Sequence, residues 1–150
     1  YILDGGACAI GIESTIVNLI GRPSILRLGG LDILKIKKTL GFKISISTNP
    51  KKKIAPGQSH LHYSPGIPLR MNVTKPKNDE AFIIIKRKKT KLKNYFYLTA
   101  KNNLDEAAKN LYSCLRKIKN EGYKSIAVEK IPNIGLGRTI NDRLSRASRY

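Results

Sequence analysis

Residues 11–30 read GIESTIVNLIGRPSILRLGG and contain two apolar stretches that are separated by a short polar turn. Side chains alternate between the two sides of an extended backbone, so Ser14 points to one side of the first stretch and Thr15 to the other. The segment GRPS at residues 21–24 is typical of a turn. We therefore expect two strands here, with a helix after them.

One cation, Arg27, interrupts the second apolar stretch. A buried charge without a partner is costly, so a covered Arg27 needs an anionic or hydrogen-bonding neighbour. In the simplest arrangement Arg27 pairs with Glu13, while Ser14 and Thr15 bond to their own sheet. In the other arrangement these polar groups form a binding site, and the residues alone leave both open.

Composition describes a globular protein of one or two small domains. The chain has 150 residues, of which 41% are hydrophobic and 26% charged. No apolar run approaches the roughly 20 residues of a membrane helix, and no signal-peptide pattern is present, so we expect a cytoplasmic protein with no membrane partner. Cys8 and Cys114 lack metal-ligand spacing and are predicted to be reduced thiols.

The formal net charge of +19 is the strongest compositional bias. It suggests RNA or another anionic partner, although a lysine-rich composition can also be a genome-wide habit. The densest run of cations, KRKKTKLK at residues 86–93, could bind phosphates or form a solvated loop. The run contains no aromatic residue, which favours the solvated loop.

Local patterns predict a first α/β unit over residues 1–48. The apolar residues 1–4 suggest a strand that begins in the middle of a sheet, and hence the tail of a longer protein. Asp32 is the expected N-cap of a helix over residues 33–40 that ends at Gly41, and residues 42–47 suit a short edge strand. The prolines and glycines of residues 49–66 predict a linker.

The remaining residues, 67–150, predict a second small α/β unit with a mostly parallel sheet. Its longest helix has an apolar face from Leu104 to Ile118, an N-cap at Asn103 and a stop at Gly122. The other expected features are strands at residues 81–85, 95–98 and 125–128, and a last helix at residues 140–147 with Thr139 as its cap and Asp142 and Arg146 as a surface pair.

Four strings in order, GIESTIVNL, ILRLGG, APGQSHLHYSP and GLGRTINDRLSRAS, resemble the carboxy-terminal portion of threonylcarbamoyl-AMP synthase, the two-domain form of the YrdC-like family. The resemblance implies that residues 1–48 are the end of a YrdC-like catalytic domain truncated at its amino-terminal side. It further implies that residues 49–66 are a linker and lid, and that residues 67–150 form a Rossmann-like domain.

The family reaction, as the resemblance implies it, joins L-threonine, bicarbonate and ATP into threonylcarbamoyl-AMP and pyrophosphate for the threonylcarbamoyladenosine modification of tRNA. This is adenylyl (nucleotidyl) transfer, in which Mg²⁺ shares the phosphate charge. The partners implied are ATP, L-threonine, bicarbonate, tRNA or tRNA-modification proteins, and a separate amino-terminal half. An alternative function is a non-catalytic basic module that binds RNA or such a protein.

Four residues match functional positions of that family. Ser14 takes the place of the serine that holds L-threonine, and Arg27 that of the arginine that contacts the nucleotide. His62 and Tyr63 match the histidine and tyrosine of the lid, whereas His60 with His62 makes a poor zinc site. The residues departing from the family pattern are Asn18, Leu28 and those of 58–61.

Part of the family's phosphate-binding chemistry has no counterpart in these 150 residues. The resemblance places a Lys-x-Arg phosphate grip and a Ser-x-Asn segment in the amino-terminal half of the catalytic domain. The triphosphate then lacks adequate counter-charge, so we expect the chain to be inactive alone and to contain no complete catalytic set.

Overall fold

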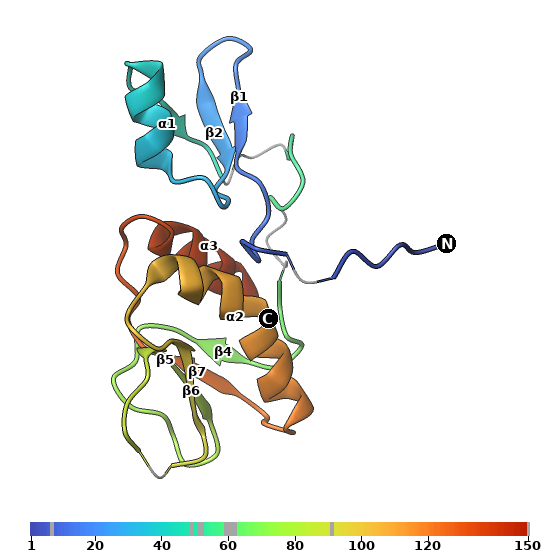
Figure 1. Cartoon of the computed structure of the whole chain (residues 1–150), viewed down its shortest axis with the longest axis vertical. Coiled ribbons are helices and arrows are strands. Elements are labelled where there is room, and N and C mark those ends of the chain that lie inside the picture. The colour runs from blue at the N-terminus through green and yellow to red at the C-terminus, as the bar shows by residue number, and fades with distance from the viewer. Residues whose placement is uncertain (7, 49, 51–52, 59–62, 91, 150) are drawn as a thin grey trace.

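A computed structural model describes residues 1–6, 8–48, 50, 53–58, 63–90 and 92–149 (Figure 1). Two units lie one against the other. A smaller one contains β1, β2, α1 and β3, and a larger one contains β4 to β7 with α2 and α3. The first residues extend away from both units.

The smaller unit is a three-stranded sheet with one helix. Strands β1 (Ile16–Asn18) and β2 (Ser24–Arg27) are antiparallel, and β3 (Ser45–Ile46) pairs in parallel with β2 at the other side. Helix α1 (Ile33–Leu40) begins where the Asp32 side chain accepts from the backbone of Leu34 and ends at Gly41, which has a φ of 71°. These elements confirm the helix and the three strands expected over residues 11–47.

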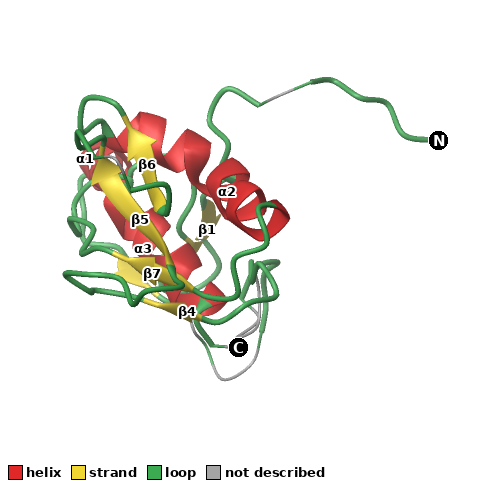
Figure 2. Ribbon diagram, turned by 90° about the horizontal axis from the view of Figure 1, so that it is seen from below, coloured by secondary structure: helices red, strands yellow, loops and turns green. Residues whose placement is uncertain are grey.

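The larger unit is a four-stranded parallel sheet in the order β4-β7-β5-β6. Helices α2 (Leu104–Asn120) and α3 (Gly137–Ala147) both lie on one side of it (Figure 2). The strands are β4 (Leu69–Arg70), β5 (Ala81–Lys86), β6 (Tyr95–Thr99) and β7 (Ile126–Val128). The parallel α/β sheet is confirmed, and only the two-residue β4, which directly follows Pro68, was not expected.

Two apolar layers cover the two faces of this sheet. On the helical face, Leu111 and Ile118 of α2 and Ile140 and Leu144 of α3 are fully buried against the strands. The cluster on the opposite face consists of strand and loop residues, namely Phe82, Ile84, Ala127, Val73 and Tyr95. Among the described residues, this second cluster therefore contains no helix residue.

Three local expectations are wrong. Residues 1–4 form no strand and are exposed, because no neighbouring strand satisfies their backbone groups. Helix α3 begins at Gly137, so Thr139 is a buried residue inside the helix instead of its cap. The pair of Asp142 with Arg146 forms at 3.1 Å, but it is buried, since the Arg146 side chain is only 7% exposed.

Within the described residues, no helix is both long and apolar enough to cross a membrane.

Candidate functional site

Ser14 and Arg27 meet on one side of the small sheet. Arg27 Nη2 donates to Ser14 Oγ, and Arg27 Nε donates to the Ser14 carbonyl oxygen, both at 3.0 Å. The guanidinium therefore holds the backbone and the side chain of Ser14 at once. The partner of Arg27 is Ser14, so the simplest arrangement, with Arg27 paired to Glu13, is wrong.

The Arg27–Ser14 pair can offer hydrogen-bond donors to an anion. A third N–H of the guanidinium points to the Pro56 carbonyl at 3.4 Å. Of its five N–H groups, two are not used by these three bonds within the described chain. Because Ser14 Oγ accepts from Arg27, the hydroxyl proton of Ser14 is left to donate elsewhere.

The backbone at Gly29 lies very close to the backbone at Ser14 and Thr15, and this contact supports the Arg27–Ser14 pair. A Cβ added at Gly29 would lie 2.2 Å from both Ser14 C and Thr15 N, so only glycine fits there. Thr15 Oγ1 donates to the Leu31 carbonyl at 2.9 Å. Thr15 thus joins the segment before β1 to the segment after β2, and its side chain does not face the Arg27–Ser14 pair.

Gln58 ties the segment after the small sheet back onto β2. Its side chain is 2% exposed. Gln58 Oε1 accepts from Ile54 N at 2.9 Å and Ala55 N at 3.0 Å. Its Nε2 donates to the Leu26 carbonyl at 3.0 Å. The described residues 53–58 are consequently anchored beside Arg27.

Tyr63 lies across the boundary between the two units. Its ring stacks on Tyr112 with centroids 5.6 Å apart, and the Arg143 guanidinium lies 4.7 Å from its centroid. A Cβ added at Gly57 would lie 2.7 Å from the Tyr63 hydroxyl and 3.1 Å from Arg27 Cδ, so the hydroxyl and the Arg27 side chain both border Gly57. His62, the other expected lid residue, lies outside the described residues, as does His60.

The backbone of Tyr63 is strained. Its φ is 69°, in the left-handed region that residues other than glycine seldom occupy. Such a backbone conformation is kept only where tertiary contacts stabilise it. At Tyr63 these are the contacts of its ring with Tyr112 and Arg143.

Arg143 connects α3 to residues next to the Arg27–Ser14 pair. It was not predicted from the sequence. Its side chain is 1% exposed. Nε donates to Glu13 Oε2 at 3.1 Å, and Nη2 donates to the Leu28 carbonyl at 2.6 Å. The signal was present, because Arg143 falls on the apolar face of α3 between Ile140 and Leu144, where a charge requires a partner. The cation that pairs with Glu13 is therefore Arg143, and not Arg27.

Two more side chains of α3 hold the smaller unit. Thr139 Oγ1 donates to the Gly29 carbonyl at 3.1 Å, and Arg146 Nη2 donates to the Thr48 carbonyl at 2.8 Å. Thr139, Arg143 and Arg146 are four and three residues apart, so they share one face of the helix. A single helix thus contacts the segment before β1, the segment after β2 and the end of the small unit.

Burial and neighbouring charges shift the pKa values of Glu13, Tyr63 and Tyr112, which lie where the two units meet. Burial alone would raise the pKa of Glu13, but a backbone hydrogen bond and the charge of Arg143 outweigh it, so this pKa lies below its usual value. Burial raises the pKa of Tyr63 and also that of Tyr112, and Glu13 adds to both shifts. Glu13 is therefore ionised and both tyrosines are neutral at physiological pH.

A hollow of about 400 Å³ opens beside Glu13 and Tyr63 at the boundary between the units. Tyr112 contributes to its apolar wall, while Arg116 and Lys119 add positive charge. Among the described residues, no three histidine, cysteine, aspartate or glutamate side chains come together as a metal-ion group.

The Glu13–Arg143 pair should make docking of the units sensitive to acid. A carboxyl whose pKa is lowered by folding stabilises the protein above its unfolded pKa, and this contribution is lost as the pH falls. We expect the stability advantage of the native chain over Glu13→Gln, measured by urea unfolding, to shrink between about pH 5 and pH 3. An advantage that does not change over this range would contradict the assignment.

Comparison with known proteins identifies the family of the chain. The family described as "Threonylcarbamoyl-AMP synthase, C-terminal domain" matches residues 31–149. The chain belongs to the threonylcarbamoyl-AMP synthase family. Threonylcarbamoyl-AMP synthase of Pyrococcus abyssi is 30% identical over 169 residues, which cover 99% of this chain and 49% of that protein. The Bacillus subtilis enzyme of the same name is 27% identical and covers 98% and 48%. The chain thus spans about half the length of these threonylcarbamoyl-AMP synthases.

Solved threonylcarbamoyl-AMP synthase structures share the fold. The crystal structure of P. abyssi Sua5 complexed with L-threonine superposes with a TM-score of 0.80 and 29% identity, over 98% of this chain and 48% of that one. A P. abyssi Sua5 variant, in which an adjacent histidine and tyrosine are both replaced by alanine, gives a TM-score of 0.75 and 26% identity, with the same coverage of both chains.

Proposed function

We propose that this chain forms the carboxy-terminal part of an L-threonylcarbamoyladenylate synthase that acts in tRNA threonylcarbamoyladenosine modification. The observation that carries the proposal is the pair of hydrogen bonds from Arg27 to Ser14, beside the buried hydroxyl of Tyr63. A serine donor, a permanent cation and a covering aromatic ring suit a site in which two anionic substrates must be held together.

The proposed roles follow from the chemistry of each side chain. Ser14 donates its hydroxyl proton to L-threonine, and Arg27 directs its remaining N–H groups to the nucleotide. In the reaction, the carboxylate of N-carboxylated threonine attacks the α-phosphorus of ATP, the bond to the β-phosphate bridging oxygen breaks, and pyrophosphate leaves. Tyr63, with His62 as its proposed neighbour, excludes water from the labile carbamate. Magnesium would be held by the ATP phosphates and by groups outside this chain.

The proposal includes a partner that carries the amino-terminal half of the catalytic domain. The smaller unit, residues 1–48, has only four buried residues in its main apolar cluster. It also exposes Ile20 (88%), Leu31 (53%) and Phe42 (48%), which suits an incomplete domain that packs against more chain. In this arrangement residues 49–66 are the lid and residues 67–150 the small α/β domain.

Mixing the parts tests this function. The purified chain alone should release no pyrophosphate from ATP, whereas the chain mixed with a polypeptide carrying the amino-terminal half should do so only with L-threonine and bicarbonate. A direct fusion of the two parts separates a failure to associate from a lack of chemistry. A stable fusion with no threonine-dependent activity would overturn the proposed function.

A further inference from the structure

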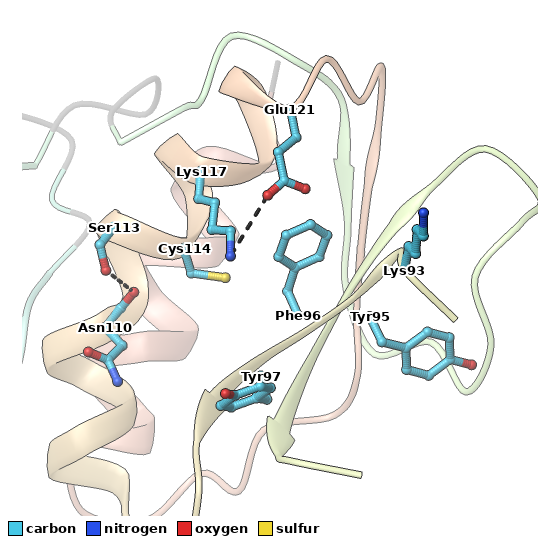
Figure 3. Close-up of a pocket in the computed structure, with 9 residues that line it drawn as sticks. All are labelled: Lys93, Tyr95, Phe96, Tyr97, Asn110, Ser113, Cys114, Lys117 and Glu121. Carbon is cyan, nitrogen blue, oxygen red and sulfur yellow. Dashed lines mark hydrogen bonds and ion pairs between the residues drawn. The ribbon is translucent and has the colours of Figure 1, made fainter. Parts of the chain in front are cut away.

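The exposed edge of the parallel sheet carries two tyrosines. Strand β6 is the outermost strand, and Tyr95 and Tyr97 are two residues apart on it, so they face the same side. Figure 3 shows both rings on the strand, while Phe96 between them points to α2. The side chain of Tyr97 is 46% exposed, which is unusual for an aromatic ring beside a buried sheet.

Two hollows meet at these tyrosines. The first, of about 350 Å³, lies on the α2 side and is lined by Lys93 and Lys117 among others (Figure 3). The second, of about 540 Å³, lies on the side of the loop after β5 and is lined by Arg87, Lys88 and Lys89. Tyr95 and Tyr97 line both, so the two hollows form one continuous surface around the sheet edge, here called the β6 edge surface.

Positive charge is in excess on the β6 edge surface. The Glu129 carboxylate pairs with Lys88 at 3.4 Å, and that of Glu121 pairs with Lys117 at 3.8 Å. The lining cations that have no carboxylate partner among the described residues are Arg87, Lys89 and Lys93. Their side chains are exposed, so phosphates can reach them from solvent.

The aromatic rings change the interpretation of this cationic loop. Its sequence contains no aromatic residue, but the fold places β6 beside it, and the Arg87 guanidinium lies 5.3 Å from the centroid of Tyr97. An exposed tyrosine with a guanidinium over one face of its ring can hold single-stranded nucleic acid, because phosphates pair with the cations and bases stack on aromatic rings or on a guanidinium plane.

We propose that the β6 edge surface binds single-stranded nucleic acid. A double helix has its bases stacked inside and offers no free face to Tyr97, whereas an unpaired strand does. The site lies on the larger unit and shares no residue with the Ser14–Arg27 pair. The nucleic-acid proposal can therefore be correct even if the proposed synthase function is wrong, and the synthase function can be correct even if the nucleic-acid proposal is wrong.

Fluorescence anisotropy with a labelled oligoribonucleotide of about ten nucleotides tests the proposal on the full chain. Arg87→Ala with Lys89→Ala should weaken binding and flatten its dependence on salt, because each lost phosphate contact lowers the slope of log affinity against log salt by about 0.7. The matched control is Lys35→Ala with Lys38→Ala, which removes the same charge from exposed positions of α1.

Tyr97→Leu isolates the stacking contribution. It should weaken binding by at least about fivefold while leaving the salt slope unchanged, because no charge is removed. Circular dichroism confirms that each variant is folded. An unlabelled oligodeoxynucleotide and inorganic polyphosphate serve as competitors. Tighter binding of the oligoribonucleotide than of the oligodeoxynucleotide identifies RNA as the ligand. Equal binding of the two oligonucleotides identifies unpaired nucleic acid in general.

Four outcomes would overturn the proposal. Equal losses in the Arg87/Lys89 and Lys35/Lys38 double variants would show that the overall charge of +19, and not this surface, attracts the strand. Full affinity in Tyr97→Leu, or competition by polyphosphate as strong as that by RNA, would show that no base stacks there. Absence of binding near physiological salt would also reject it.

Discussion

Replacing Arg27 by methionine is expected to lower threonine-dependent pyrophosphate release, in the fused or mixed enzyme, by roughly 10²- to 10³-fold. The substitution removes a cation from the proposed nucleotide site and also releases Ser14, which Arg27 holds by two bonds of 3.0 Å. Initial rates at saturating ATP and L-threonine measure the loss.

The matched control for this substitution is Arg22→Met. Arg22 is an exposed arginine in the turn of the same hairpin, so its loss should change the rate by less than about twofold. Arg27→Lys keeps the charge but not the planar fork, and it should recover only a small part of the rate. Equal rates for Arg27→Met and Arg22→Met would remove Arg27 from the site.

Arg143→Met is expected to destabilise the smaller unit by about 3 kcal/mol, at the low end for a broken buried ion pair, because Glu13 keeps part of its side chain in solvent. The change takes the ion-pair partner from Glu13, leaves the Leu28 carbonyl without its guanidinium donor and removes the cation from the Tyr63 ring. Urea unfolding followed by circular dichroism at neutral pH measures the free-energy change.

Arg138→Met on the same helix is the control for Arg143. Among the described residues the Arg138 side chain donates only to the Asn133 carbonyl, so its loss should cost no more than about 1 kcal/mol. A double-mutant cycle of Arg143→Met with Glu13→Gln isolates the pair, and we expect a coupling of about 1 to 3 kcal/mol. Additive effects in this cycle would show that the two side chains do not interact.

Most elements of the fold could be predicted because their signals are local. Asp32, Asn103 and Gly41 act at helix ends through bonds within a few residues, and the buried run of residues 81–85 needs no distant partner to be recognised. The errors at residues 1–4 and Thr139 have the opposite cause. A strand requires a neighbour, and a helix start depends on what the preceding turn packs against.

The site divides in a similar way. Ser14 and Arg27 could be named from the sequence, and the structure brings them together. Arg143 and Tyr112 could not be named from the sequence, because they lie about 100 residues or more from Glu13 in the chain. No local sequence pattern indicates which distant group a buried cation contacts. The tyrosines beside the cationic loop were missed for the same reason.

By itself the sequence determined the resemblance to the family and most of the helices and strands, since each of these depends on residues close together along the chain. Only the tertiary structure decided that α3 docks the smaller unit through Arg143, that Tyr63 is held between Arg143 and Tyr112, and that aromatic rings border the lysine-rich loop. These contacts join distant segments, and their partners are selected by burial and charge in three dimensions.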